Sequence, residues 1–437
     1  MNRILFFLNC GCIFLLASFA YAQEQVKPAT LKDSVVLAVK NHPKIKAMMH
    51  NRDAMRGNKA AALGRFFPSL DLRSSFGTLQ QSDPLTRTSK KDDDFNTYID
   101  TSLSLRLNLF AGFGDVNTYK GAKRRLSSAE YRLHDNVESI ALDAIRAHYD
   151  VVRERRLLEL ARKNIEDHKI LLGAIAERVQ GGATDRADET QANSRLSRAE
   201  TTLISYQGKL RNAEADYIWA TGVAPRQLLQ PVYHEDFLLG DLEVILEDCE
   251  TNNPKILAAM EDARALGYDV CVTRAKYLPR VDAVASSHYR SDVKHSGEYV
   301  RDHRGALEAS WNLFNGMTDV RVTQVAKARE EEGYALFEKT ALDVNRDVVA
   351  AWFDYQTAVK EVENYKRTLD FSRETNEMYM VQFNVGQRSL LDMLDSLNEV
   401  FNNSVLLETA RMNRSYSLYK LLALQGRLVR ALEVSYQ

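Results

Sequence analysis

The sequence predicts an α+β membrane protein in which each chain contributes four β-strands to a shared transmembrane barrel that continues into a long α-helical barrel. Three observations lead to this prediction: an internal duplication, short segments of strictly alternating polarity, and very long helical stretches without proline. The 437 residues have a mean hydropathy of −0.35, which is too polar for a bundle of membrane-spanning helices. The 58 Lys and Arg residues balance the 59 Asp and Glu residues, so the composition gives no electrostatic reason to expect nucleic-acid binding.

Residues 1–22 have the composition of a secretory signal peptide. Arg3 precedes an apolar segment that begins at Ile4, and the segment ends in the small-residue pattern from Ala20 to Ala22. Such a segment is removed from the mature protein. We therefore expect the folded chain to begin at Gln23.

The remainder of the chain is an internal duplication. The segment NHPKIKAMM at 41–49 matches NNPKILAAM at 252–260 with an offset of 211, and NLFAGFGDV at 108–116 matches NLFNGMTDV at 312–320 with an offset of 204. An offset that changes once means that the first copy has seven additional residues between these motifs, and insertions of this kind belong in exposed loops.

The duplication divides the chain into similar parts. Each part is expected to contain a helix, a pair of strands, a very long helix, a tight turn and a returning helix. The expected divisions are a first repeat at 23–222, a connector at 223–242 and a second repeat at 243–437.

The strand segments are expected near 66–110 in the first repeat and near 277–314 in the second. Around residue 99 the odd positions are mostly apolar and the even positions are polar, which is the period of a β-strand with one apolar face. The odd positions are Ile99, Thr101, Leu103, Leu105, Leu107 and Leu109, and the even positions are Asp100, Ser102, Ser104, Arg106 and Asn108. The second repeat alternates in the same way, and strands of about ten residues with an apolar outer face fit a bilayer-spanning barrel.

Long helical hairpins are expected at 113–222 and 317–432. No proline occurs between residues 85 and 224, and all eight prolines lie at or before position 279. An apolar stripe with a period of 3.6 residues continues through each segment. Helices of nearly seventy residues would be about 100 Å long, a length typical of coiled coils and helical barrels.

Four strands cannot close a barrel around a channel. An open sheet edge in lipid would leave backbone groups without hydrogen bonds, so the chain must associate with other copies. Three copies would provide twelve strands. A barrel of about eight strands is filled by its own side chains and one of about sixteen encloses an aqueous pore, so a barrel of twelve strands should have a water-filled lumen. We therefore expect a homotrimer in contact with membrane lipid, with the polar strand faces lining the lumen.

These features together resemble the TolC family of trimeric outer-membrane exit ducts. The resemblance covers the duplicated unit, the two LF-x-G junctions from strand to helix, and the stretch QFNVGQRSLLDMLDSLNEVF at 382–401. It implies the outer membrane of a Gram-negative bacterium, a periplasmic helical extension, and two partners: a periplasmic adaptor (membrane fusion protein) and an inner-membrane ABC transporter. The same stretch is more similar to the type I secretion branch, including adhesin exporters, than to the drug-efflux branch.

Two other functions are a multidrug efflux duct and a secreted coiled-coil protein. A multidrug efflux duct has the same architecture, and the sequence does not identify the exported substrate. A secreted coiled-coil protein would have no use for the amphipathic strands. The sequence contains no G-x-S-x-G, H-E-x-x-H or phosphate-binding glycine loop, so we expect neither an enzyme nor a cofactor.

The resemblance also implies a gate at the periplasmic end of the hairpins. Asp392 and Asp395 would face the lumen and form two acidic rings in a trimer. Asp392 and Asp188 each lie three residues after a possible N-cap, Ser389 and Asp185 respectively, so both could instead cap the start of a helix. Asp395 lies too deep in its helix for this role.

The same resemblance assigns a latch and a set of contact residues. Arg388 would tie neighbouring hairpins together through Asp188, and Phe383 stands where the family commonly has Tyr, which removes one hydroxyl group. The tight turns are expected to use left-handed glycines and also match the family's adaptor-contact tips. The tip residues are Gly181, Gly182, Val385 and Gly386.

Overall fold

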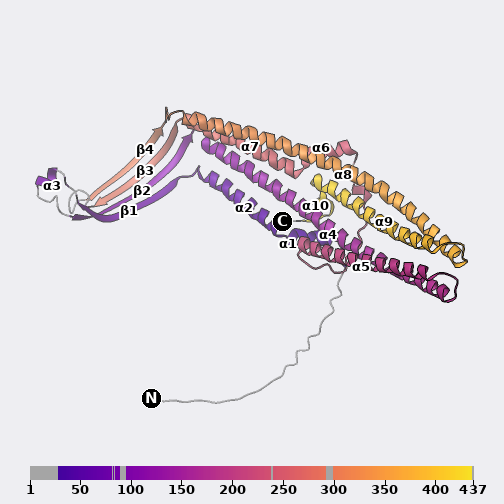
Figure 1. The fold of residues 1–437 in the computed structure, drawn as a ribbon. Coiled ribbons are helices and arrows are strands. Elements are labelled where there is room, and N and C mark those ends of the chain that lie inside the picture. The colour runs from indigo at the N-terminus through magenta and orange to yellow at the C-terminus, as the bar shows by residue number, and fades with distance from the viewer. Residues whose placement is uncertain are drawn as a thin grey trace, which may run out of the picture.

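The computed structural model describes residues 28–80, 82, 84–88, 95–237, 240–291 and 299–435, so the expected signal peptide lies outside the described residues. The molecule is elongated, with a curved sheet at one end and two helical hairpins at the other (Figure 1). The hairpin tips are the points farthest from the sheet. None of the described helices is both long enough and apolar enough to cross a membrane.

The two halves share a series of two helices, two strands, a long helix and a returning helix. The first half comprises α1 (Leu31–Asn41), α2 (Pro43–Gly64), β1 (Ser69–Gln80), α3 (Pro84–Thr88), β2 (Phe95–Ala111), α4 (Gly114–Gln180) and α5 (Arg186–Thr221). After a 3₁₀ turn, η1 (Glu235–Phe237), the second half comprises α6 (Leu242–Asn252), α7 (Pro254–Arg274), η2 (Ala275–Tyr277), β3 (Arg280–Ser291), β4 (Tyr299–Ser310), α8 (Thr318–Asn384), α9 (Leu390–Leu424) and α10 (Leu428–Ala431). Within the halves, only α3, η2 and α10 have no counterpart among the described elements.

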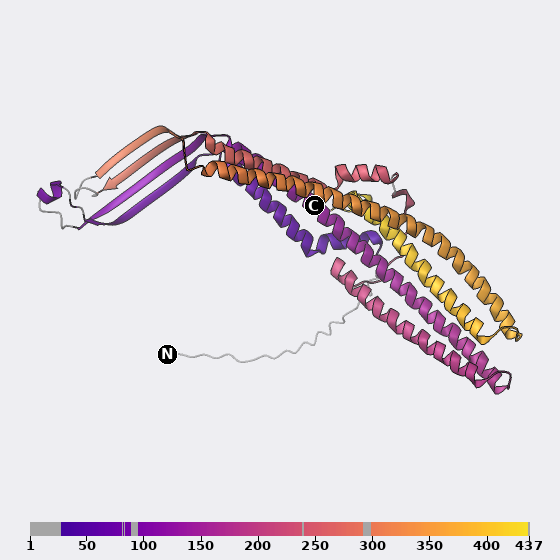
Figure 2. The ribbon, with the colours of Figure 1, turned by 45° about the horizontal axis from the view of Figure 1, so that its top comes forward.

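The seven additional residues of the first repeat lie between its two strands. Fourteen residues, 81–94, separate β1 from β2, whereas seven residues, 292–298, separate β3 from β4. Helix α3 occupies part of the longer connection. The insertion therefore extends the strand hairpin at the end of the sheet that lies away from the helices (Figure 2).

The four strands form one antiparallel sheet in the order β1-β2-β3-β4. The register places Leu70 opposite Leu105 and Leu105 opposite Ala285, so one row of small and apolar side chains crosses three strands. Most of the larger apolar side chains on this face are exposed, as expected for a surface that meets lipid. The four-strand prediction is confirmed, and within the described chain β1 and β4 are open edges.

The opposite face of the sheet carries a network of charged side chains. Arg106 on β2 contacts Asp282 on β3 at 3.1 Å and Glu308 on β4 at 3.6 Å. Arg280 adds a second contact to Asp282 at 3.0 Å. Because Asp282 and Glu308 are directly opposite each other in the register, the arginines offset the repulsion between two neighbouring carboxylates.

The predicted alternation ends one residue early in β2. A bulge between Asn108 and Phe110 leaves Leu109 without a partner, so that Phe110 rather than Leu109 pairs with Val281. A bulge bends and twists the strand at the point where it occurs. Here it lies immediately before the chain turns from the sheet into α4.

The junctions from strand to long helix have the same backbone conformation in both repeats. Gly112 and Phe113 have φ of 58° and 65°, and Gly316 and Met317 have φ of 68° and 65°. Two successive left-handed residues therefore turn the chain into α4 and α8. Glycine is needed at the first of them for different reasons, since a Cβ at Gly112 would lie 2.3 Å from the Ala275 carbonyl oxygen, whereas a Cβ at Gly316 would have no neighbour within 4 Å.

This difference gives a matched pair of variants. Gly112→Ala and Gly316→Ala should both lower the free energy of unfolding by about 1 kcal/mol or more, because alanine is strained in the left-handed backbone conformation. Only Gly112→Ala must also displace the η2 backbone, and this displacement should lower the free energy of unfolding by roughly a further 1 to 3 kcal/mol. We expect thermal unfolding of the purified protein in detergent to occur at a clearly lower temperature for Gly112→Ala, and equal midpoints would contradict this packing.

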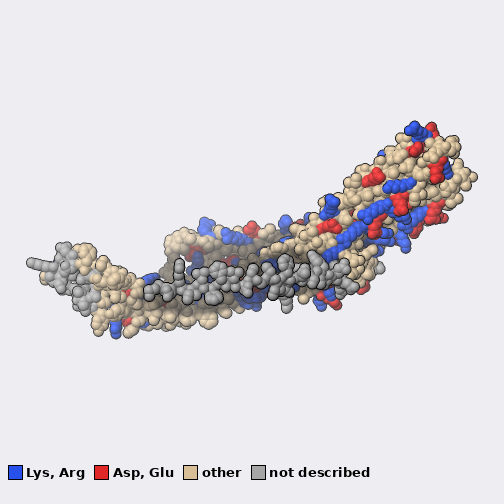
Figure 3. All heavy atoms as spheres, turned by 90° about the horizontal axis from the view of Figure 1, so that it is seen from below, with Lys and Arg blue, Asp and Glu red and all other residues tan. Residues whose placement is uncertain are grey.

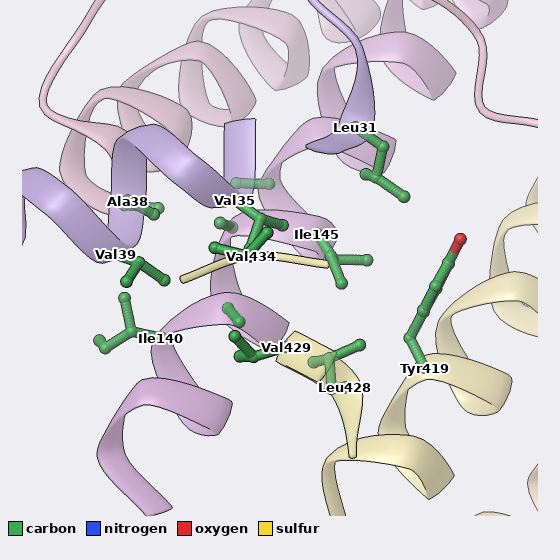
Figure 4. Close-up of a cluster of buried hydrophobic side chains, with 14 of the residues drawn as sticks. Leu31, Val35, Ala38, Val39, Ile140, Ile145, Tyr419, Leu428, Val429 and Val434 are labelled. Atoms are coloured by element: carbon green, nitrogen blue, oxygen red, sulfur yellow. The ribbon is translucent and has the colours of Figure 1, made fainter. Parts of the chain in front are cut away.

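The long helices α4 and α8 are 67 residues each and connect the sheet to the hairpin tips. Near the sheet α4 packs against α2 and α7, and farther along it packs against α5; α8 packs against α7 and then α9 (Figures 1 and 2). Halfway along, the two ends of the described chain meet on α4. Val35 of α1 and Leu428 of α10 contact the same buried cluster as Ile145, which fixes this region (Figure 4).

A buried histidine attaches the connector to this region. His148 of α4 is fully buried, and burial lowers the pKa of its ring. Its Nε2 donates to the Leu229 carbonyl oxygen at 2.9 Å, and its Nδ1 accepts from the Ser34 hydroxyl at 2.8 Å. The Tyr217 hydroxyl lies 2.9 Å from the same Ser34 oxygen. The connector is thereby bonded directly to α4, and through Ser34 the same network reaches α1 and α5.

Candidate functional site

The candidate site is the pair of turns at the ends of the two helical hairpins. Gly182 and Gly386 have φ of 71° and 78°, and each turn has the same two backbone hydrogen bonds that close a helix C-terminus. The expectation of left-handed glycines is confirmed at these two positions. It is wrong for Gly181, which has φ of −76° because it still continues the right-handed end of α4. Val385 is the C-cap residue that follows α8 and is 66% exposed.

One arginine joins the two turns. Arg178, in the last turn of α4, donates to the carbonyl oxygens of Phe383 at 2.8 Å and Asn384 at 3.3 Å. Its guanidinium also lies 4.1 Å from the centre of the Phe383 ring, and Phe383 is only 4% exposed. A cation at the last carbonyl groups of a helix is favoured by the helix dipole. Phe383 is therefore a stacking surface between the hairpins, a role that needs no hydroxyl group.

Arg388 makes its contacts within its own hairpin. Its Nε donates to the Gln382 side chain at 2.9 Å, and its guanidinium lies 4.1 Å from the Tyr379 ring centre and 3.6 Å from the Asp392 carboxylate. Asp188 instead accepts a hydrogen bond from the Thr184 hydroxyl. The described residues of one chain thus do not bring Arg388 and Asp188 together, and their pairing stays a prediction about neighbouring chains.

The two predicted gate carboxylates each have an arginine beside them. The Asp392 backbone N–H donates to the Ser389 hydroxyl at 3.2 Å, so the capping interpretation is correct at the start of α9. At the start of α5, Asp185 forms no side-chain cap bond. Asp395 is 59% exposed and lies 3.0 Å from Arg195 of α5. Its carboxylate is therefore available to solvent but partly neutralised.

Sequence reasoning did not identify Arg178 or Arg195 as site residues. Both contact residues about 200 positions away, so no local pattern shows the contacts. The duplication does offer one indication. The residues at the matching positions of the second repeat are Gln382 and Glu399, so the two hairpins differ in charge where they meet.

Charged residues of both signs surround the tips. Figure 3 shows Lys, Arg, Asp and Glu side chains spread over the hairpin end of the visible face. The described part of the sheet end visible in this view is mostly uncharged. On this face the hairpin end is therefore more highly charged than the described part of the sheet end.

The contact made by Arg178 can be tested by local unfolding. Replacing Arg178 by Ala removes two hydrogen bonds and the ring contact, so amide exchange in residues 383–390 should accelerate by roughly three- to tenfold, corresponding to about 1 kcal/mol. Arg186→Ala, which changes an exposed arginine on the same tip, serves as the control. Hydrogen exchange mass spectrometry that finds no difference between the two variants would contradict the contact.

The comparisons with known proteins agree with this architecture. The family described as "Outer membrane efflux protein" matches residues 35–223 and 245–427. The outer membrane efflux protein BepC of Brucella suis biovar 1 is 22% identical over 95% of this chain and 89% of its own length. The toxin and drug export protein A of Aggregatibacter actinomycetemcomitans is 19% identical over 63% of this chain and 61% of its own length.

A solved structure has the same fold. The outer membrane protein VceC of Vibrio cholerae superposes with a TM-score of 0.78 at 17% identity, covering 93% of this chain and 97% of that protein. The family match spans both halves of the duplication and most of the described elements. TolC-like channels are passive trimers that work with adaptor proteins and inner-membrane transporters. The chain belongs to the outer membrane efflux protein family and is a TolC-like channel protein of the outer membrane with a periplasmic helical extension.

Proposed function

We propose that this chain forms the homotrimeric exit duct of a type I secretion system. In this role it passively conducts a polypeptide such as an adhesin from a periplasmic adaptor and an inner-membrane ABC transporter to the exterior. The tip sequence 382–401 carries this proposal, because it resembles that branch of the family and includes the turn between α8 and α9 at the end of the second hairpin. The name of one relative, a toxin and drug export protein, supports the same direction.

The open edges of the sheet support the trimer. Strands β1 and β4 each have one unpaired side within the described chain, and in lipid those backbone groups need partners. Three chains joined edge to edge would give twelve strands, with the charged face around Arg106 toward the lumen. The repeats at 23–222 and 243–437 would each supply two strands and one long hairpin, joined by the connector at 223–242.

The gate is proposed at the hairpin tips. Arg388 of one hairpin would pair with Asp188 of a neighbouring hairpin, and the carboxylates of Asp392 and Asp395 would form two rings at the entrance. The adaptor would contact the turns that contain Gly181, Gly182, Val385 and Gly386. The exposure of Val385 supports this contact, since an apolar side chain at a tip is otherwise left in water.

Multidrug efflux is the second candidate function. The relative BepC, an outer membrane efflux protein aligned over 95% of this chain, favours it. In both functions the same duct would work with a different transporter. The transporter would select the substrate, because a wide channel has no tight substrate pocket. The two functions therefore differ in which substrate the cell fails to export when the duct is removed.

A deletion strain of the native host distinguishes the two functions. If the duct serves type I secretion, a secreted polypeptide should disappear from the culture medium while susceptibility to dyes, detergents and antibiotics stays close to that of the parent strain. Plasmid-borne protein should restore secretion. A strain that keeps its secreted proteins and becomes sensitive to small toxic compounds would overturn the proposal in favour of efflux.

A further inference from the structure

The outward face of the sheet carries a single ionised side chain in the described strands. Every other Asp, Glu, Lys and Arg of β1 to β4 is on the opposite, polar face by the strand register: Asp71, Arg73, Asp100, Arg106, Arg280, Asp282, Arg290, Asp302, Arg304 and Glu308. Arg301 alone is in register with Tyr289 and Thr101 on the apolar face. This face contains no carboxylate in the described strands that could neutralise it.

Aromatic rings hold Arg301 in place. Its guanidinium carbon lies 5.4 Å from the ring centres of both Tyr289 and Tyr299. The two rings are themselves stacked, with centres 6.3 Å apart. Cation–π contacts hold a guanidinium through the ring faces and do not use its N–H groups as hydrogen-bond donors to another side chain. The side chain is exposed, so its donors are available to a ligand.

The position along the strand places Arg301 near the outer surface of the membrane. Trp311, an exposed aromatic residue beyond the helix-proximal end of β4, is ten residues from Arg301. Ten residues of a strand tilted by about 40° span roughly 25 Å along the membrane normal, the height of the apolar band of an outer-membrane barrel. If Trp311 marks the periplasmic boundary, Arg301 lies at the opposite boundary, at the level of the lipid headgroups.

Neighbouring residues on this face add polar groups. His303 and Ser287 are directly opposite each other in the next row toward the centre of the sheet, and both are on the outward face. A β1 strand of a neighbouring chain, placed against β4 by trimer formation, would present Ser74, Phe76, Thr78 and Gln80 and no carboxylate. The anion that matches this arginine must therefore come from outside the described strands.

We propose that Arg301, held by its contacts with the rings of Tyr289 and Tyr299, binds the phosphate of a lipid headgroup in the outer leaflet. A guanidinium binds phosphate through two parallel hydrogen bonds, and this geometry distinguishes it from a simple positive charge. The inference uses the outer-membrane location of the family and the trimer of the proposed function. It does not depend on which transporter supplies the channel.

The test titrates the purified full-length protein in detergent with bisphosphorylated lipid A and counts bound lipids by native mass spectrometry. Arg301→Ala should weaken lipid binding roughly fivefold per site, the effect of one basic residue at an anionic membrane surface. Arg304→Ala is the matched control, because Arg304 is three residues away on the same strand but on the polar face. Arg301→Lys should be intermediate, since it keeps the charge and loses the paired donors.

Two further probes identify the ligand. The first probe is lipid A treated with a phosphatase. It should bind the parent protein as weakly as phosphorylated lipid A binds Arg301→Ala. The second probe is inorganic phosphate, which at equal concentration should not displace the lipid from the parent protein. Equal binding by Arg301→Ala and the parent, equal losses in Arg301→Ala and Arg304→Ala, or retained binding of the dephosphorylated lipid would each overturn the proposal. Displacement by inorganic phosphate would overturn the lipid assignment. Channel conductance of Arg301→Ala should match the parent, which separates this test from those of the gate.

Discussion

Replacing Leu105 by Arg should strongly impair assembly of the protein in the outer membrane. Leu105 lies in the middle of β2, on the apolar face, between Leu70 and Ala285 of the neighbouring strands. A charged side chain there would face the lipid, at a cost of about 2 to 4 kcal/mol near the bilayer midplane. A trimer would contain this substitution three times. The fraction of protein recovered as folded channel from outer-membrane preparations should therefore fall sharply.

Ser104→Arg is the matched control for this experiment. Ser104 is the adjacent residue on the same strand, and it is opposite Asp71 and Ser286 on the charged face. An arginine there would enter a polar environment that already contains Arg106 and Arg304. We expect its recovery to be close to that of the parent protein. Equal losses from the two variants would show that the assignment of the faces is wrong.

Replacing Arg388 by Ser should raise the single-channel conductance in planar lipid bilayers. The Arg388 and Asp392 side chains are 35% and 43% exposed, and ion pairs at such positions contribute about 0 to 1 kcal/mol. A pairing of Arg388 with Asp188 of a neighbouring chain should be similarly weak. A weak latch is appropriate for a gate that opens when an adaptor binds, because binding can shift an equilibrium only by its differential affinity for the two states.

Replacing Asp392 and Asp395 together by Ala should weaken cation selectivity and block by multivalent cations. Because Arg195 lies 3.0 Å from Asp395, the parent channel should be less selective than two unpaired acidic rings would make it. Arg195→Ala should therefore increase cation selectivity. An Arg388→Ser channel that conducts like the parent, together with a double Asp variant that keeps its cation preference, would place the gate elsewhere.

The sheet and the long helices could be predicted from the sequence because each has one polar and one apolar side. Leu103 and Leu105 alternate with Ser102 and Ser104, and this period determines both the strand and the faces of the sheet. The insertion between β1 and β2 was evident from the change of offset. The bulge at Leu109 was not, because a bulge changes hydrogen bonding without changing the order of apolar residues.

The contacts of the candidate site were less predictable than the fold. The contacts of Arg178 with Phe383 and of Arg195 with Asp395 depend on the relative rotation of two hairpins that are encoded 200 residues apart. A rotation of either long helix by a fraction of a turn would separate these side chains, and periodicity alone does not fix that rotation. The turn glycines Gly182 and Gly386 could be located because a helix that ends in a tight turn needs a left-handed residue.

We propose that the four strands of one chain form a closed barrel only when chains associate. The most direct test is the mass of the purified mature protein in detergent, measured by native mass spectrometry. We expect a particle of three chains that persists at concentrations where non-specific complexes dissociate, because each open edge of β1 and β4 is then paired. A stable, folded monomer in the same measurement would contradict this assembly.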